Sequence, residues 1–122
     1  MQLRAGGQKL KDNRKYRRVH SRLRCWCEGK NVTFYARVGN LSEGGLFLKT
    51  STPLTTGSEA TLRFEGAGGP PVQARATVMW ARGEGDEGSP GMGLRFEQVD
   101  SGQLERLREI ILGEQKTDKS NE

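Results

Sequence analysis

The sequence predicts an all-β protein, a six-stranded antiparallel barrel with one C-terminal amphipathic helix. Three observations support this fold class. Apolar residues recur at every second position in six segments between the polar ends of the chain, as half-buried strands require. Seventeen glycines among 122 residues indicate many tight turns. One segment near the C-terminus has helical spacing instead. A chain of this length buries one compact core, so a single domain is expected.

The six predicted strands follow one another in the chain, separated by polar segments that contain glycine. Four of these connections span residues 28–31, 53–57, 65–71 and 83–91. Within each strand, the apolar residues at alternate positions should face the barrel interior. In chain order, the expected inward residues are Leu23 and Cys25, with Cys27 at the next inward position; Val32, Phe34, Ala36 and Val38; Leu46 and Leu48; Ala60, Leu62 and Phe64; Val72, Ala74, Ala76, Val78 and Trp80; and Met92, Leu94 and Phe96.

The helical segment carries its apolar residues on one face, namely Leu104, Leu107, Ile110 and Ile111. Asp100 or Ser101 can act as the N-cap, and Gly113 is well placed to end the helix. We expect this helix to lie across one mouth of the barrel and to seal the core. Arg106 and Arg108 alternate with glutamates in the same segment, a pattern typical of exposed ion pairs.

The two ends of the chain are polar and aperiodic. Residues 1–13 and 114–122 should therefore be flexible tails on either side of a barrel domain at residues 14–113. The sequence has no apolar run long enough to span a membrane and no secretory signal, so a cytoplasmic protein is expected. Cys25 and Cys27 should be reduced and buried. Because His20 is the only histidine, we expect no metal ion and no other cofactor.

The distribution of charge points to an anionic partner. The formal charge is +5, and the positive residues crowd into residues 9–24. There the stretch Arg14-Lys15-Tyr16-Arg17-Arg18 has the pattern RxxxR, and further along Asn40-Leu41-Ser42-Glu43-Gly44-Gly45 has the pattern NxSxxG. Arginine binds phosphate or guanine bidentately and stacks on bases. The Asn amide and Ser hydroxyl supply hydrogen-bonding groups, and glycine permits close approach. Such an arm and turn suit a compact anionic nucleotide.

In this order the two motifs resemble the signature of PilZ domains, the bacterial receptors for cyclic di-GMP. The segments at residues 44–50 and 90–96 also resemble PilZ strands, so the similarity runs from about Asn13 to Gly113. The resemblance implies a non-enzymatic receptor that binds cyclic di-GMP and signals to an unidentified partner protein. The ligand-binding residues that it implies are Arg14, Lys15, Arg17, Arg18, Asn40, Ser42, Gly44 and Gly45, with Phe96 as a candidate for the border of the site.

The register of the first motif has two solutions, because Arg18 and Arg22 also have the RxxxR spacing. We prefer Arg14 and Arg18, since the family places a basic and then an aromatic residue after the first arginine. The family often has Asp at the position of Asn40, whose amide oxygen still accepts a hydrogen bond.

Two other functions suit a small basic barrel. One is a ligand-independent adaptor with the same fold. The other is binding of single-stranded nucleic acid, which needs outward aromatic residues on which bases stack. Only Tyr35 and Phe47 are candidates for outward aromatic positions, so nucleic-acid binding is the weaker prediction. No activated nucleophile or metal-ligand set points to an enzyme. The cations expected on outward strand faces are Lys49, Arg63, Arg75 and Arg95.

Overall fold

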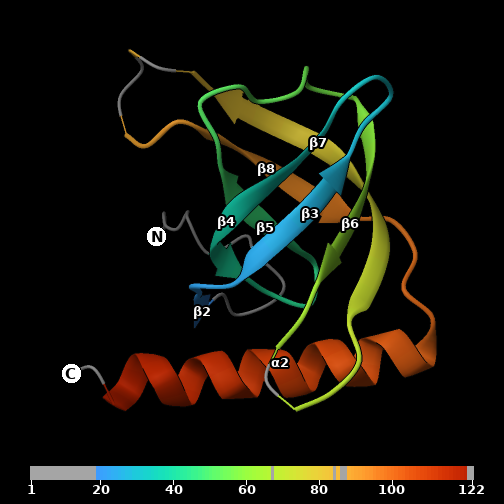
Figure 1. Ribbon diagram of the computed structural model, residues 1–122, viewed down its shortest axis with the longest axis vertical. Helices are drawn as coiled ribbons and strands as arrows, with labels where there is room; N and C mark the ends of the chain where they lie inside the picture. The colour runs from blue at the N-terminus through green and yellow to red at the C-terminus, as the bar shows by residue number, and fades with distance from the viewer. Residues whose placement is uncertain (1–18, 67, 84, 86–87, 121–122) are drawn as a thin grey trace, which may run out of the picture.

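The computed structural model of the protein describes residues 19–66, 68–83, 85 and 88–120, with side chains as far as residue 115. All six predicted strands are present (Figure 1). Every pairing between them is antiparallel, and in the order β4-β3-β6-β7-β8-β5 the last strand pairs back with the first. The predicted six-stranded closed barrel is therefore confirmed. Its strands are β3 (Arg24–Glu28), β4 (Thr33–Leu41), β5 (Gly45–Lys49), β6 (Glu59–Phe64), β7 (Val72–Arg82) and β8 (Gly91–Phe96).

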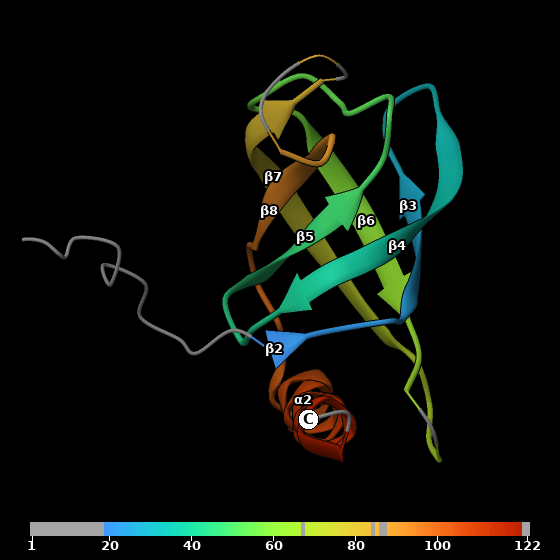
Figure 2. The same ribbon diagram turned by 90° about the vertical axis from the view of Figure 1, so that its left-hand side faces the viewer.

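A further short strand, β2 (Val19–His20), precedes the barrel strands and is not predicted by the sequence. It pairs with the end of β4, where Val19 lies opposite Leu41 and His20 opposite Asn40. The Val19 side chain is buried, whereas His20 is exposed. Figure 2 shows β2 between the end of β4 and the C-terminal helix. A strand of two residues is too short for an alternating apolar pattern to be recognised.

The barrel interior is filled by the inward residues of the strands, much as the alternation predicts. Phe64 and Phe96 stack inside it with their ring centroids 6.3 Å apart. Val32 does not follow the prediction. Its side chain is 43% exposed, because β4 begins one residue later, at Thr33.

Cys25 and Cys27 are buried on the inward face of β3, and both are free thiols, as predicted. Burial raises the pKa of Cys25 to about 12, with the neighbouring Cys27 adding to the shift, and burial raises the pKa of Cys27 to about 11. In the unfolded chain both thiols ionise near pH 9. Above that pH the unfolded state therefore binds fewer protons than the folded state, and stability must fall as pH rises.

We expect the free energy of unfolding to fall above pH 9 by up to about 1.4 kcal/mol per pH unit for each thiol. Urea denaturation over a series of pH values measures this slope. A Cys25→Ala/Cys27→Ala variant should be less stable at neutral pH, because it leaves cavities, but its stability should fall less steeply above pH 9. Equal slopes for the variant and the natural chain would contradict the prediction.

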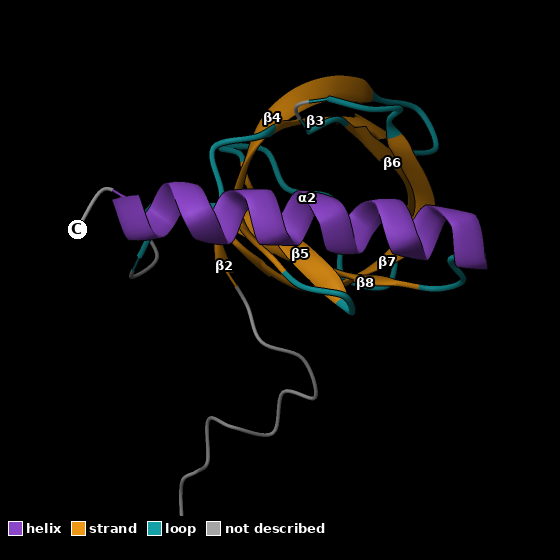
Figure 3. Cartoon of the chain, turned by 90° about the horizontal axis from the view of Figure 1, so that it is seen from below, coloured by secondary structure: helices purple, strands orange, loops and turns teal. Residues whose placement is uncertain are grey.

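The C-terminal helix α2 (Ser101–Ser120) crosses one mouth of the barrel (Figure 3). Its residues Leu107 and Ile110 are buried and belong to the barrel core. Asp100 is the N-cap, since its Oδ1 accepts a hydrogen bond from the backbone N–H of Gln103 at 2.9 Å. The predicted helix start, cap and sealing position are confirmed. Within the described part of the chain, no helix has both the length and the apolar character needed to cross a lipid bilayer.

The end of the helix differs from the prediction, because α2 passes through Gly113 and continues to Ser120. A glycine ends a helix when it adopts positive φ, and Gly113 is not among the glycines with positive φ. An internal glycine otherwise costs a helix only about 1 kcal/mol. The continuation is also held to the barrel, because the backbone N–H of Arg22 donates to Oε1 of Glu114 at 3.1 Å. The stretch from residue 114 to residue 120 is therefore helical, where a flexible tail was expected.

Arg106 is not the exposed residue that the charge pattern predicts. Its side chain is only 10% exposed and pairs with Glu109 at 3.1 Å. Its guanidinium donates hydrogen bonds to the carbonyl oxygens of Pro70 at 2.7 Å and Gly66 at 3.0 Å. Arg106 therefore holds the loop between β6 and β7 against α2, a tertiary contact that helical spacing alone does not reveal.

Candidate functional site

The turn between β4 and β5 is held together by Ser42, the serine of the NxSxxG motif. This residue is buried, with 3% of its surface exposed. Its backbone N–H donates to the carbonyl oxygen of Gly45 at 2.9 Å, and its hydroxyl donates to the same oxygen at 3.4 Å. The hydroxyl also accepts a hydrogen bond from the N–H of Gly44 at 3.1 Å. Ser42 therefore builds the turn, and its predicted contact with a ligand stays a prediction.

Gly45, the glycine of the same motif, is the first residue of β5 and pairs with Arg95 of β8. A Cβ atom at this position would overlap the carbonyl oxygen of Leu94 and lie 3.1 Å from the Cα of Arg95. The missing side chain therefore lets β5 approach β8 and close the barrel. Packing of the two strands accounts for this glycine, whereas the sequence analysis assigned the space to a ligand.

Phe96 was a candidate for the border of the site, but its ring lies in the core. The residue is 8% exposed and stacks on Phe64. It supports the turn through its backbone, because its N–H donates to the carbonyl oxygen of Gly44 at 2.9 Å. Inward alternation along β8 explains why the ring cannot face the outer surface.

Asn40 is the polar side chain of the motif that faces outward. It lies within β4, one residue before the strand ends at Leu41, and not in the turn as expected. Its cross-strand partners are His20 in β2 and Phe47 in β5. Cross-strand partners share a face of the sheet, and the adjacent Leu41 is fully buried. Asn40 is therefore presented on the outer face of the barrel, where it is half-buried.

The predicted arginine arm meets the barrel beside this residue. Arg14, Lys15, Arg17 and Arg18 lie outside the described residues. The residue that follows Arg18 is Val19, which is buried and paired with Leu41 in β4. Val19, the first described residue, therefore lies at the end of β4, between Asn40 and the Ser42 turn in the strand register. Figure 2 shows β2 at this end of β4. The structure brings Val19 and His20 next to the second motif, although the sequence separates them from it by about twenty residues.

An aromatic pair extends the outer face from Asn40 across the barrel. Phe47 of β5 lies opposite Asn40 and opposite Gly93 of β8, which in turn lies opposite Trp80 of β7. The Phe47 and Trp80 rings stack with centroids 5.4 Å apart and planes inclined by 14°. The guanidinium carbon of Arg82 lies 5.1 Å from the Trp80 ring centroid and 5.6 Å from that of Phe47. The outer face therefore carries a continuous row of side chains, formed by Asn40, Phe47, Trp80 and Arg82.

The position of Trp80 differs from the prediction, whereas Phe47 faces outward as predicted. Trp80 was expected inside the barrel but is 42% exposed, because the pairing of β7 with β8 shifts register between Val78 and Trp80. Phe47 faces outward as expected, yet the Trp80 ring covers it and leaves 7% exposed. A Cβ atom at Gly93 would overlap the Trp80 ring, and one at Gly91 would overlap Phe47. Two glycines alternating with apolar residues in a strand are the sequence signal for rings lying over the outer face.

Two contacts connect α2 to this region. Arg108 pairs with Glu43 of the motif turn at 3.2 Å, and not with a glutamate of its own helix as the charge pattern suggests. The hydrogen bond from Arg22 to Glu114 ties the helix to the segment between β2 and β3. Both partners of the ion pair are partly exposed, so it contributes little to stability on its own.

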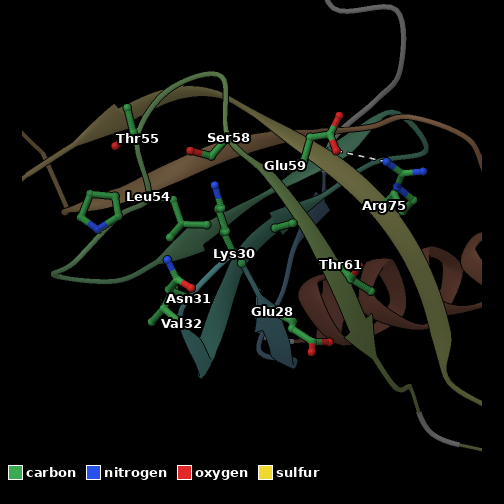
Figure 4. A pocket seen from close by; sticks show the side chains of 13 residues that line it. Glu28, Lys30, Asn31, Val32, Leu54, Thr55, Ser58, Glu59, Thr61 and Arg75 are labelled. Atoms are coloured by element: carbon green, nitrogen blue, oxygen red, sulfur yellow. Dashed lines mark hydrogen bonds and ion pairs between the residues drawn. The ribbon is translucent and has the colours of Figure 1, made fainter.

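A separate cleft of about 920 Å³ lies beside the turn between β3 and β4 (Figure 4). Lys30 and the ion pair of Glu59 with Arg75, 3.1 Å apart, are among the residues lining it. None of the predicted site residues lines it. Because charges of both signs surround this cleft, it has no clear preference for an anion.

These features define a class of protein, a small closed antiparallel β-barrel domain with one C-terminal helix across its mouth. Among the described residues, no cluster of His, Cys, Asp and Glu could hold a metal ion. The family model of the PilZ domain matches residues 12–113. The chain therefore belongs to the PilZ family, as the two motifs predict.

Solved PilZ structures share the fold. The PilZ domain of YcgR from Escherichia coli, determined with c-di-GMP, superposes with a TM-score of 0.73 at 18% identity, over 90% of this chain and 97% of that one. The inhibitor of motility MotI/DgrA from Bacillus subtilis gives 0.69 at 17% identity, over 86% of this chain and 52% of that one. MrkH from K. pneumonia, as its c-di-GMP complex, gives 0.70 at 19%, over 91% and 55%. The chain thus spans about half the length of MotI/DgrA and MrkH. No curated protein matches it in sequence.

Proposed function

We propose that the protein is a non-enzymatic receptor for cyclic di-GMP, which binds between the arginine arm and the outer face of β4 and β5. The observation that carries this proposal is the pairing of Val19 with Leu41, which starts the arm beside Asn40. Membership of the PilZ family supports it. Further support comes from the similarly folded domains of YcgR and MrkH, whose structures hold c-di-GMP.

The outward residues Asn40 and Trp80, together with the arginines of the predicted arm, fit the chemistry of this ligand. Cyclic di-GMP has two phosphates and two guanine bases, and Arg14 and Arg18 are the side chains that bind such groups bidentately. Asn40 faces outward within reach of a base edge, and the exposed face of Trp80 can stack on a base. Ser42, by contrast, acts indirectly by holding the turn in shape.

Binding would order the arm at the place where β2 meets α2, and a partner protein would recognise the surface formed there. Ordering residues of the arm costs conformational entropy, so a moderate affinity is expected. Because several contacts join cations to phosphates, the affinity should also decrease as salt increases.

Isothermal titration with cyclic di-GMP tests the proposal, with GTP and cyclic di-AMP as controls for charge and for the base. Saturable heat with cyclic di-GMP alone is the expected result. An Asn40→Ala variant should bind more weakly while its thermal unfolding stays close to that of the natural chain. If cyclic di-GMP gives no heat at low salt, the receptor proposal is wrong, and a ligand-independent adaptor becomes the better interpretation.

A further inference from the structure

A row of three cations crosses the outer face of the barrel on the side formed by β5, β4 and β3. Lys49 lies opposite Arg37, and Arg37 lies opposite Arg24. All three side chains are exposed. Neighbouring strands are about 4.8 Å apart, so like charges face one another directly, an arrangement that destabilises a sheet unless an anion relieves it.

These cations differ from four other arginines of the barrel and the helix. Arg75, Arg95, Arg106 and Arg108 each form an ion pair with a glutamate. Among the described residues, no carboxylate pairs with Lys49, Arg37, Arg24 or Arg63. The positive charge on this side of the barrel is therefore not neutralised within the described part of the protein.

A second row, two residues further along the strands, adds aromatic rings. Tyr35 lies opposite Trp26, and Trp26 lies opposite Arg63. The Tyr35 and Trp26 rings meet edge to face with centroids 4.8 Å apart, and Tyr35 is 61% exposed. A recess of about 230 Å³ opens beside them, lined in part by Arg24 and Arg63. These two rings and two guanidinium groups therefore line a space large enough for one flat group, and Glu65 is the one acidic residue among its lining.

We propose that these two rows form a binding face for single-stranded nucleic acid, separate from the cyclic di-GMP site. The face consists of Lys49, Arg37, Arg24, Arg63, Tyr35 and Trp26. Cations that follow a phosphate backbone beside aromatic rings that stack on bases are the two components that such binding requires. The sequence analysis disfavoured nucleic acid because outward aromatic residues appeared scarce, but Trp26 and Trp80 also lie on the outer face, and Trp80 is 42% exposed.

Duplex DNA suits the face less well than a single strand. Stacked and paired bases cannot reach Tyr35, whereas the bases of a single strand can turn towards it. The face also lies across β5, β4, β3 and β6, while the row from Asn40 to Trp80 lies across β4, β5, β8 and β7. Variants of either site can therefore be made without changing the side chains of the other.

Fluorescence anisotropy of a labelled oligothymidylate of about 12 nucleotides, titrated with the full chain, tests the proposal. The logarithm of the binding constant should fall linearly with the logarithm of salt concentration, with a slope of about −3 for four cations that contact phosphates. Arg24→Ala and Arg37→Ala should each weaken binding by about threefold or more at low salt and reduce the slope by about 0.7. Tyr35→Ala should weaken binding by about tenfold and leave the slope unchanged.

Two control variants distinguish binding at this face from attraction to positive charge elsewhere in the protein. Arg95→Ala removes an outward cation that is paired with Glu97 at 3.7 Å, and it should leave both affinity and slope nearly unchanged. An Arg14→Ala/Arg18→Ala variant, which lacks two arginines of the arm, should still bind and retain the dependence on Arg24. Circular dichroism and thermal unfolding confirm that each variant is folded, and none of these measurements depends on cyclic di-GMP.

The proposal is wrong if no saturable binding occurs at low salt, or if Arg24→Ala and Arg37→Ala have no larger effect than Arg95→Ala. If the Arg14→Ala/Arg18→Ala variant lost all binding, the oligonucleotide would bind the arm, and the proposed binding face would also be wrong. Equal affinity for duplex DNA would exclude base stacking. Binding of polyglutamate but not of the oligonucleotide, abolished by Arg37→Ala, would show instead that the face recognises an acidic protein.

Discussion

Arg18→Ala is expected to weaken cyclic di-GMP binding by about ten- to a hundredfold, since a bidentate guanidinium contact is worth roughly 1–3 kcal/mol. Arg18 directly precedes Val19, whose side chain is buried and whose backbone pairs with Leu41. Of the arginines in the predicted arm, it is the nearest in sequence to strand β2, which pairs with Asn40 and Leu41. Isothermal titration of the variant measures the loss, and its thermal unfolding should match that of the natural chain.

Arg22→Ala is the matched control for this result. Arg22 is exposed in the segment between β2 and β3, and its backbone N–H, which the substitution preserves, donates to Glu114. If Arg14 and Arg18 form the RxxxR motif, the variant should bind cyclic di-GMP nearly as well as the natural chain. Equal losses for Arg18→Ala and Arg22→Ala would show that the motif has the other register.

Gly45→Ala is expected to reduce the free energy of unfolding by about 3 kcal/mol or more, a loss at the upper end of overpacking effects. The added methyl group would overlap the backbone of β8 at Leu94, and backbone atoms of a closed barrel cannot move aside as a flexible side chain can. Much of the variant should be unfolded or aggregated at 37 °C. Urea denaturation followed by circular dichroism measures the change.

Gly113→Ala makes the same chemical change but should increase the free energy of unfolding. A Cβ atom at Gly113 meets nothing within 4 Å, and the residue lies inside α2. Alanine should stabilise the helix there by up to about 1 kcal/mol. If Gly45→Ala proved as stable as Gly113→Ala, the approach of β5 to β8 could relax, and the motif glycine would need another explanation. Loss of ligand binding in Gly45→Ala alone would not identify a ligand contact.

The barrel could be predicted because its strands obey simple alternation. Residues such as Leu62, Val72 and Leu94 are apolar, evenly spaced and buried, and each agrees with the period of two. The helix start could likewise be predicted from Asp100, whose capping hydrogen bond is local in sequence. Local rules thus fix where elements begin and which face is buried.

Other features depend on contacts between distant segments, which no local pattern encodes. Trp80 leaves the core because of a register shift, and the choice of register depends on the partner strand β8. The Arg106 side chain is largely shielded from solvent because the carbonyl oxygens of Gly66 and Pro70, forty and thirty-six residues earlier, accept its hydrogen bonds. In the candidate site, the assignment of Asn40 to the ligand stays a prediction, and the roles of Ser42 and Gly45 in the turn emerge only from their neighbours.

The packing of β2 against α2 has a consequence for the order in which the protein can be assembled. Strand β2 consists of two residues, pairs with the end of β4, and contacts the helix formed by the last segment of the chain. Such a strand is too short to persist by itself. During synthesis on the ribosome it would have to wait until residues beyond 114 have emerged and folded across the barrel mouth. A nascent chain that does not yet include α2 would lack the helix contact of β2, so Val19 and His20 would be less firmly held against the end of β4.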